Sequence, residues 1–155
     1  MTAHRSHRAP AAPVQRAAQL VGIVFLVAGV LGFIPGITTD YGSMTIASHE
    51  SDAELLGLFQ VSVLHNLVHL VYGLVGLTLA GTAAAAHSYL LVGGAVYLVL
   101  WVYGLSVGPD SDANFVPLNS ADDWLHFALG LVMIALALAL GHRRPTRTSG
   151  TGAQR

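Results

Sequence analysis

The positions of the charged residues constrain this chain more than any other feature of its sequence. All seven basic residues are arginines, and they lie within 5–16 and 143–155. All eight carboxylates lie within 40–54 and 110–123, and the segments between these charged regions are predominantly apolar. Because Lys and Arg concentrate on the cytoplasmic side of a bilayer, the pattern predicts cytoplasmic termini and two outer acidic segments. The chain should therefore cross the membrane an even number of times.

The composition favours the same class of protein. Charged residues make up 10% of the chain and hydrophobic residues 54%, with a mean hydropathy of +0.62. Soluble domains carry about a quarter charged residues. At 155 residues the chain has room for one domain. We therefore predict an all-α protein, an integral membrane four-helix bundle of the cell membrane.

The domain boundaries follow from the apolar stretches, since about 20 apolar residues are needed to cross the hydrocarbon. Tails at 1–16 and 142–155 should be disordered and cytoplasmic, and the transmembrane domain should occupy 17–141. The predicted spans are about 17–34, 58–80, 88–107 and 122–141.

Two capping-box patterns predict where the second and fourth helices begin. Ser51 to Glu54 should start a helix that runs to Leu79 or Ala80, with its first turns outside the hydrocarbon. Ser120 to Asp123 should start the fourth helix. Each pattern is followed by a histidine, but the rest of the two halves does not align, so the sequence alone does not predict a duplicated hairpin.

Several classes of function are excluded or disfavoured. The chain has no cysteine, which excludes disulfides, thiolate metal sites, iron–sulfur clusters and cysteine nucleophiles. With a net charge of −1 and arginines split between the tails, there is no basic face for nucleic acid. We find no nucleophile elbow, no phosphate-cradling loop and no acid/base pair with a plausible pocket, so we do not expect an enzyme.

Polar and small residues form one stripe on the second predicted helix and another on the fourth. The repeat of three and four residues places each set on one helical face, which should point into the bundle. The first set is Ser62, His65, Asn66, His69, Tyr72, Gly73 and Gly76, and the second is Asp123, His126, Gly130, Met133 and Ala137.

Three imidazoles, those of His65, His69 and His126, could therefore converge below the outer surface. His65 and His69 have the i, i+4 spacing with which one helix can share a metal, and His126 would supply a third ligand. Haem is a variant, with one of the first two histidines and His126 on opposite faces of the ring. The plain alternative is hydrogen bonding between helices, and a proton-linked pathway is a further one.

Three segments resemble a known family. They are Gly57 to Val61 (GLFQV), Leu64 to Leu70 (LHNLVHL) and Ala121 to His126 (ADDWLH). Together they resemble the bacterial four-span membrane proteins grouped as domain of unknown function 4383, over roughly residues 17–141. The resemblance implies an integral membrane protein without an assigned activity.

We therefore expect a small structural or accessory membrane protein without a cofactor. The alternatives are a metal- or haem-binding membrane subunit and an oligomeric proton-linked transporter or channel. The expected partners are the lipid bilayer and either a second copy of the chain or another membrane protein.

Overall fold

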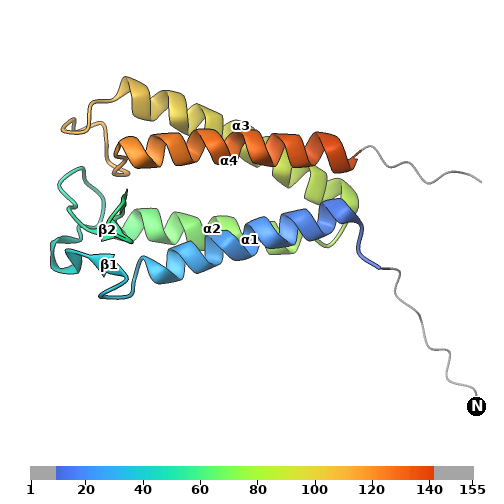
Figure 1. Cartoon of the computed structure of the whole chain (residues 1–155), viewed down its shortest axis with the longest axis horizontal. Coiled ribbons are helices and arrows are strands. Elements are labelled where there is room, and N and C mark those ends of the chain that lie inside the picture. The colour runs from blue at the N-terminus through green and yellow to red at the C-terminus, as the bar shows by residue number, and fades with distance from the viewer. Residues whose placement is uncertain (1–9, 142–155) are drawn as a thin grey trace, which may run out of the picture.

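The chain folds into four helices with a small folded cap at one end (Figure 1). The computed structural model describes residues 10–141, so most of the first predicted tail and all of the second lie outside the described residues. The helices are α1 (Pro13–Leu31), α2 (Val63–Leu79), α3 (Ala83–Ser106) and α4 (Ser120–Gly141). The cap contains strands β1 (Thr38–Thr39), β2 (Glu54–Leu55) and β3 (Phe59–Gln60), and a 3-10 turn at Tyr41–Ser43. The prediction of an all-α membrane bundle is confirmed.

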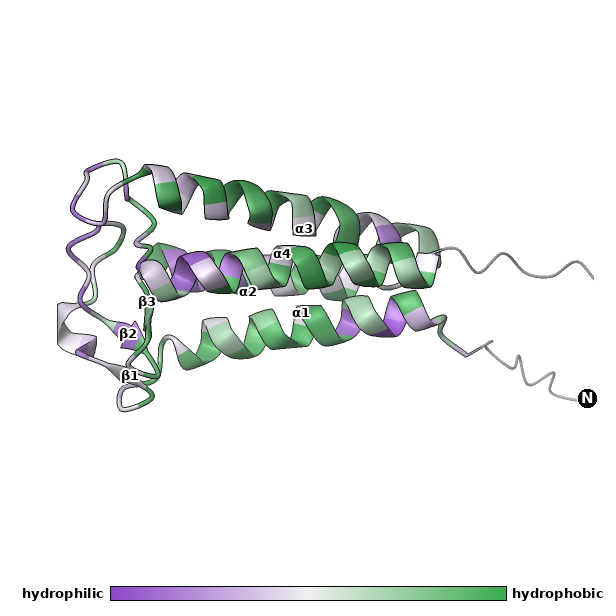
Figure 2. Cartoon of the chain, turned by 45° about the horizontal axis from the view of Figure 1, so that its top comes forward, coloured by the Kyte–Doolittle hydropathy of each residue, from purple (hydrophilic) through white to green (hydrophobic). Residues whose placement is uncertain are grey.

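Three helices, α1, α3 and α4, are long and apolar enough to cross a membrane. The fourth, α2, is also apolar but has 17 residues, which is roughly 26 Å by helix rise. Figure 2 shows hydrophobic residues along all four helices and hydrophilic residues mainly in the cap. The protein is thus an integral membrane protein in which the four helices form the larger part of the described residues.

The helices pair as two hairpins, α1 with α2 and α3 with α4, and contacts between the hairpins are fewer (Figure 1). At the end of the bundle opposite the cap, the Gln15 amide donates to the carbonyls of Ala80 and Gly81 at 2.9 and 3.0 Å. These bonds fix the start of α1 to the tight turn between α2 and α3.

The second helix begins later than its capping-box pattern predicts. Residues near Ser51 are extended, and β2 pairs antiparallel with both β1 and β3. The Ser51 hydroxyl donates to the Val61 carbonyl at 2.6 Å instead of capping a helix. The true N-cap is Ser62, whose hydroxyl accepts from the His65 amide at 3.2 Å. The prediction that a capping box at Ser51 starts the second helix is therefore wrong.

The fourth helix begins one residue from its predicted cap. The Asn119 side chain accepts from the amides of Ala121 and Asp122, at 2.9 and 3.0 Å, and the Asp122 carboxylate accepts from the Asn119 amide at 3.0 Å. This is a reciprocal capping box with Asn119, not Ser120, at its first position.

Each hairpin is held together by a close approach of two glycine backbones. A Cβ atom added to Gly73 would lie 2.6 Å from the Gly22 carbonyl oxygen, and one added to Gly94 would lie 2.8 Å from the Gly130 carbonyl oxygen. Small residues permit such contact between helices in membranes, where dispersion replaces the hydrophobic effect as the driving force.

These contacts show that the two hairpins are structural repeats. Gly94 of α3 occupies the place of Gly22 of α1, and Gly130 of α4 occupies the place of Gly73 of α2. The same two shifts along the sequence relate other contacts in the two hairpins. Leu26 packs against Gly73 in the first hairpin, as Leu98 packs against Gly130 in the second. Asn66 likewise packs against Gly32, as Asp123 packs against Gly104. The shift from α1 to α3 is larger than the shift from α2 to α4 because the segment that joins the two helices is longer in the first hairpin. No single sequence shift therefore aligns both helices of the first hairpin with both helices of the second.

Candidate functional site

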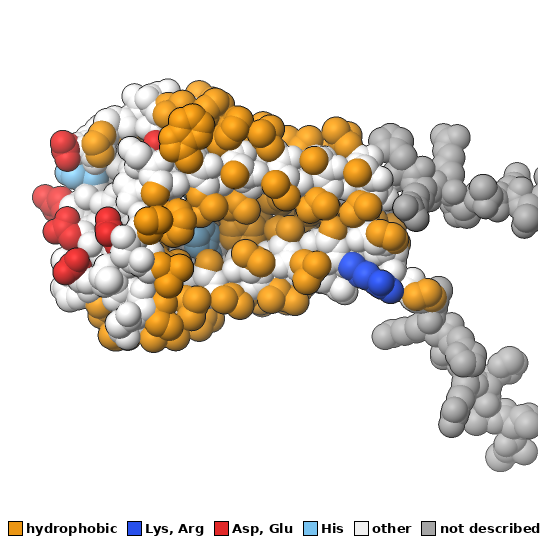
Figure 3. Space-filling model, viewed as in Figure 1, with side chains coloured by type: hydrophobic (Ala, Val, Ile, Leu, Met, Phe, Trp, Pro, Cys, Tyr) orange, Lys and Arg blue, Asp and Glu red, His pale blue; other side chains and the backbone are white. Residues whose placement is uncertain are grey.

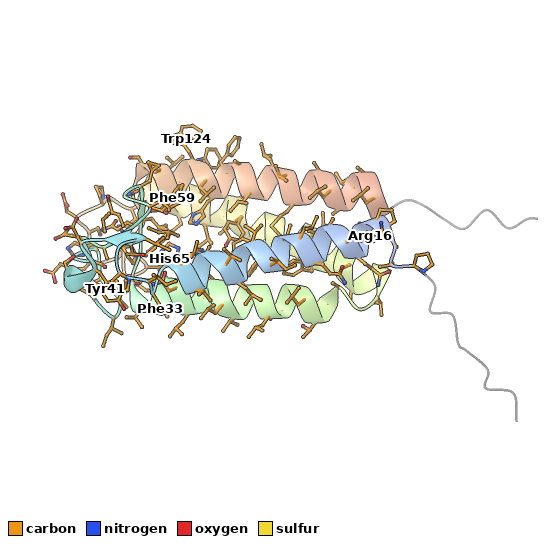
Figure 4. All side chains as sticks on the ribbon, turned by 60° about the horizontal axis from the view of Figure 1, so that its bottom comes forward. Arg16, Phe33, Tyr41, Phe59, His65 and Trp124 are labelled. Carbon is orange, nitrogen blue, oxygen red and sulfur yellow. The ribbon has the colours of Figure 1, made fainter. Side chains whose placement is uncertain are left out.

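The three predicted imidazoles lie at the interface between the two hairpins. His65 and His69 come from α2 and His126 from α4. Most residues of the two stripes are buried as predicted, but His69 and Tyr72 are half-buried. The His65 and His69 ring centroids are 4.6 Å apart. Figure 4 shows His65 near the cap end of the bundle, away from Arg16 at the opposite end. Histidine side chains lie recessed between hydrophobic ones in Figure 3.

A layer of aromatic rings packs against the imidazoles on the side away from the cap. Its residues are related by the same sequence shift as the two hairpins. Phe25 contacts His69 with ring centroids 5.5 Å apart, and Tyr97 contacts His126 at 5.1 Å. Phe25 and Tyr97 are related by the same sequence shift as Gly22 and Gly94, and their ring centroids are 5.3 Å from each other. Both rings are buried. The hairpins therefore meet through matched pairs of aromatic rings.

Two pockets open on either side of the three imidazoles. The first has a volume of about 360 Å³ and lies between α1, α4 and the cap. The second, of about 290 Å³, lies between α2, α3 and the segment that joins α3 to α4. His65, His69 and His126 line both pockets. The imidazoles thus form a wall between the two pockets.

Each of the three imidazoles keeps one ring nitrogen unused. The Nδ1 atoms of His65, His69 and His126 are buried and have no hydrogen-bond partner in the protein. The side chains of His65 and His126 are each 4% exposed. An unpaired buried polar group costs free energy, so these atoms reduce the stability of the bundle.

Asp122 connects the cap to the bundle at the rim of the first pocket. Its Oδ2 atom accepts from the amide of Gln60 in β3 at 3.0 Å and from the Asn119 amide at 3.0 Å. The Asn119 side-chain amide also donates to the Leu58 carbonyl at 2.9 Å. The start of α4 is therefore bonded to a segment of the first hairpin, and the cap sits in a fixed position over the imidazoles.

A three-ligand metal site receives no support from the arrangement. Within residues 10–141, no three His, Cys, Asp or Glu side chains are grouped so that they could hold a metal ion. The imidazoles of His65 and His69 meet edge to face at 64°.

The family comparison gives one match. The model described as Domain of unknown function (DUF4383) matches residues 15–139. The chain belongs to this family. The resemblance read from the three sequence segments is thereby confirmed, and the match covers nearly all of the four helices. No curated protein and no solved structure matches the chain.

The sequence stripes identified the imidazoles but missed other residues of this interface. Phe25 and Tyr97 were not singled out as site residues, although each follows a tightly packed glycine, Gly22 or Gly94, at the same short spacing. That shared spacing is the signal that could have found them. The sequence places Asp122 at the start of the fourth helix, but nothing in it shows that Gln60 lies beside this carboxylate.

Proposed function

We propose that this protein is a non-enzymatic accessory protein of the cell membrane that crosses the bilayer four times, with both termini in the cytoplasm. The supporting observation is the separation of charge along the bundle. Arg16 is the one basic residue among residues 10–141 and lies at the inner end, while the acidic side chains visible in Figure 3 gather at the cap. Lys and Arg favour the cytoplasmic side.

The cap is the part of the protein that an external partner would meet. It is bonded to the bundle at several points, since the amides of Val63 and Leu64 donate to the carbonyls of Thr45 and Ile46 at 3.0 and 2.9 Å. These bonds also satisfy the first amides of α2, which a helix start otherwise leaves unpaired. In this role the protein presents a rigid acidic cap outside the cell to another membrane protein or a second copy, and needs neither metal nor haem.

Membrane topology can be measured directly because the chain has no native cysteine. Ala47 is exposed in the cap and Ala84 is exposed at the inner turn, so each can be replaced singly by cysteine. In intact cells, a membrane-impermeant maleimide should label Ala47→Cys and should leave Ala84→Cys unlabelled until the cells are permeabilised. Labelling of Ala84→Cys in intact cells would reject the proposed orientation.

A further inference from the structure

Within residues 10–141, four large apolar side chains outside the helices are more than half exposed. Ile46, Leu56, Leu58 and Phe115 are 78%, 66%, 51% and 54% exposed. We call these four residues the apolar collar. Exposed apolar side chains that gather on one surface mark contact with a partner or a membrane, whereas scattered ones need no explanation. The position of the collar relative to the helices therefore decides what it contacts.

The collar lies at the base of the cap, beside the ends of the helices. The Ile46 carbonyl accepts from the Leu64 amide in the first turn of α2 at 2.9 Å. The Leu58 carbonyl accepts from the side chain of Asn119, the N-cap of α4, at 2.9 Å. Most acidic side chains visible in Figure 3 lie farther from the helices, at the far end of the cap.

Leu56 and Phe115 continue the lipid-facing surface of the spanning helices. Leu56 lines the first pocket together with Val24 and Val27 of α1, which are themselves exposed on the helix. Phe115 lines the second pocket together with Val99 of α3, which is also exposed. The walls of both pockets are almost entirely apolar. The apolar surface that faces lipid on the helices therefore extends onto the cap.

Part of the collar recurs in both hairpins. The sequence shift that relates α2 to α4 also relates Leu58 to Phe115, and each lies shortly before the second helix of its hairpin. The same shift relates Val61, which lines the first pocket, to Leu118, which lines the second. An exposed apolar side chain at the same place in both halves is a property of the repeat and not an isolated surface residue.

The first two helices are too short to cross the hydrocarbon without help from the cap. From Ala17, the residue after Arg16, to the end of α1 at Leu31 is roughly 22 Å by helix rise, and α2 is roughly 26 Å long. The hydrocarbon core of a bilayer is about 30 Å thick. It therefore extends beyond α1 to the depth at which the Leu56 amide donates to the Ile37 carbonyl, at 2.9 Å.

The turn between β2 and β3 has the backbone bonding that contact with lipid requires. Backbone polar groups in a bilayer need partners within the protein. The three amides of residues 56–58 all donate to carbonyls of the chain, at 2.9, 3.2 and 3.2 Å. Leu56 has a φ of 58°, in the left-handed region that leucine rarely adopts. Asparagine or aspartate would suit this turn better in water, so leucine here provides an apolar surface that the turn itself does not need.

We propose that the apolar collar is inserted in the leaflet on the cap side of the membrane and contacts lipid chains there, while the acidic part of the cap stands in water above it. The occupant is lipid and not a partner protein because the collar continues a surface that already faces lipid. The collar completes the hydrophobic thickness that α1 and α2 lack. It leaves the acidic part of the cap free to meet a partner.

The experiment measures membrane depth with spin labels on single cysteines in the full-length chain, which has no native cysteine. Each collar residue is replaced singly by cysteine and labelled with a nitroxide, and the protein is reconstituted in phosphatidylcholine vesicles. Relaxation of the nitroxide by oxygen, which partitions into lipid, is compared with relaxation by a neutral, water-soluble nickel chelate. At all four positions the ratio of oxygen to nickel relaxation should be several-fold above that of a water-exposed position. The variants are Ile46→Cys, Leu56→Cys, Leu58→Cys and Phe115→Cys.

Two matched controls lie in the same connections as the collar. Asp52→Cys shares the connection between α1 and α2 with Leu56, and Asp112→Cys shares the connection between α3 and α4 with Phe115. Both native carboxylates are exposed, so their labels should respond mainly to the nickel chelate. Val24→Cys, on the lipid-facing side of α1, should respond mainly to oxygen and so shows that the bundle is folded in the vesicles.

Three outcomes would overturn the proposal. Nickel relaxation at the collar as strong as at Asp52→Cys and Asp112→Cys would mean that the collar stands in water. Weak relaxation by both reagents, with an immobilised label, would mean that a second copy of the chain covers the collar. A response to oxygen in one hairpin alone would contradict the shared position of Leu58 and Phe115. The collar lies at a membrane surface in either orientation of the bundle, so this result and the topology result are independent.

Discussion

Replacing Gly73 or Gly130 with valine is expected to destabilise the bundle severely. A Cβ at Gly73 would lie 2.6 Å from the Gly22 carbonyl oxygen, and one at Gly130 would lie 2.7 Å from the Leu98 side chain and 3.0 Å from the Gly94 carbonyl oxygen. Overpacking costs about 1–3 kcal/mol and occasionally more. Since backbone atoms cannot rotate away, we expect the upper end of this range or above. The readout is the temperature at which half of the detergent-solubilised protein is lost from the monodisperse peak.

Gly42→Val is the matched control, because nothing lies within 4 Å of a Cβ added at Gly42 in the cap. It should leave the midpoint close to that of the wild type. Wild-type midpoints for both Gly73→Val and Gly130→Val would contradict the close packing within the hairpins. An effect at one glycine alone would contradict the equivalence of the two hairpins.

Asp122→Ala should be the most damaging substitution of a polar residue. Asp122 accepts from the amides of Gln60 and Asn119, and both would lose their partner. Each unpaired buried group costs about 1–3 kcal/mol. Because the bond to Gln60 joins the cap to α4, we also expect faster amide hydrogen exchange in β3 and at the start of α4.

Asp112→Ala provides the comparison, since Asp112 is exposed in the segment that joins α3 to α4. It should change neither the midpoint nor the exchange. Asp122→Asn keeps one acceptor oxygen and should fall between Asp122→Ala and wild type. If Asp122→Ala and Asp112→Ala behave alike, the cap is not held by this carboxylate.

The bundle and most of the buried stripe residues could be predicted from the sequence for a physical reason. Apolar length and charge position determine which segments can lie in a bilayer, and the spacing of His65, Asn66 and His69 determines which helical face they share. The structure buries His65 and Asn66 and exposes Leu67 and Val71, as that spacing predicts.

The cap could not be predicted because its turn chemistry is unusual. Leu56 and Gly57 have positive φ angles of 58° and 66° at the turn between β2 and β3. Hairpin turns with two positive φ angles normally carry Asn-Gly or Asp-Gly. With leucine at the first position, the segment gives no hairpin signal, and the nearby Ser51 pattern suggested a helix start instead.

The interface between the hairpins depends on long-range pairing that local patterns do not encode. The repeat is expressed in contacts, such as Phe25 with His69 and Tyr97 with His126, and not in matching residues. The segments that join the helices within the two hairpins also differ in length, which hides the repeat from a sequence alignment. Only the folded structure shows that the same three imidazoles line two equivalent pockets.

The most direct test of this arrangement is cysteine cross-linking between the hairpins. In the Cys-free chain, Phe25→Cys with Tyr97→Cys should be joined within one molecule by a short bifunctional thiol reagent, detected as a linked peptide, because the native rings fill the space between the two backbones and lie 5.3 Å apart. The equivalent outward pair, Val24→Cys with Val96→Cys, should not, because these side chains are 58% and 46% exposed to lipid. Cross-linking of the outward pair in place of the inward one would contradict the account of two repeated hairpins that meet at the aromatic and imidazole layers.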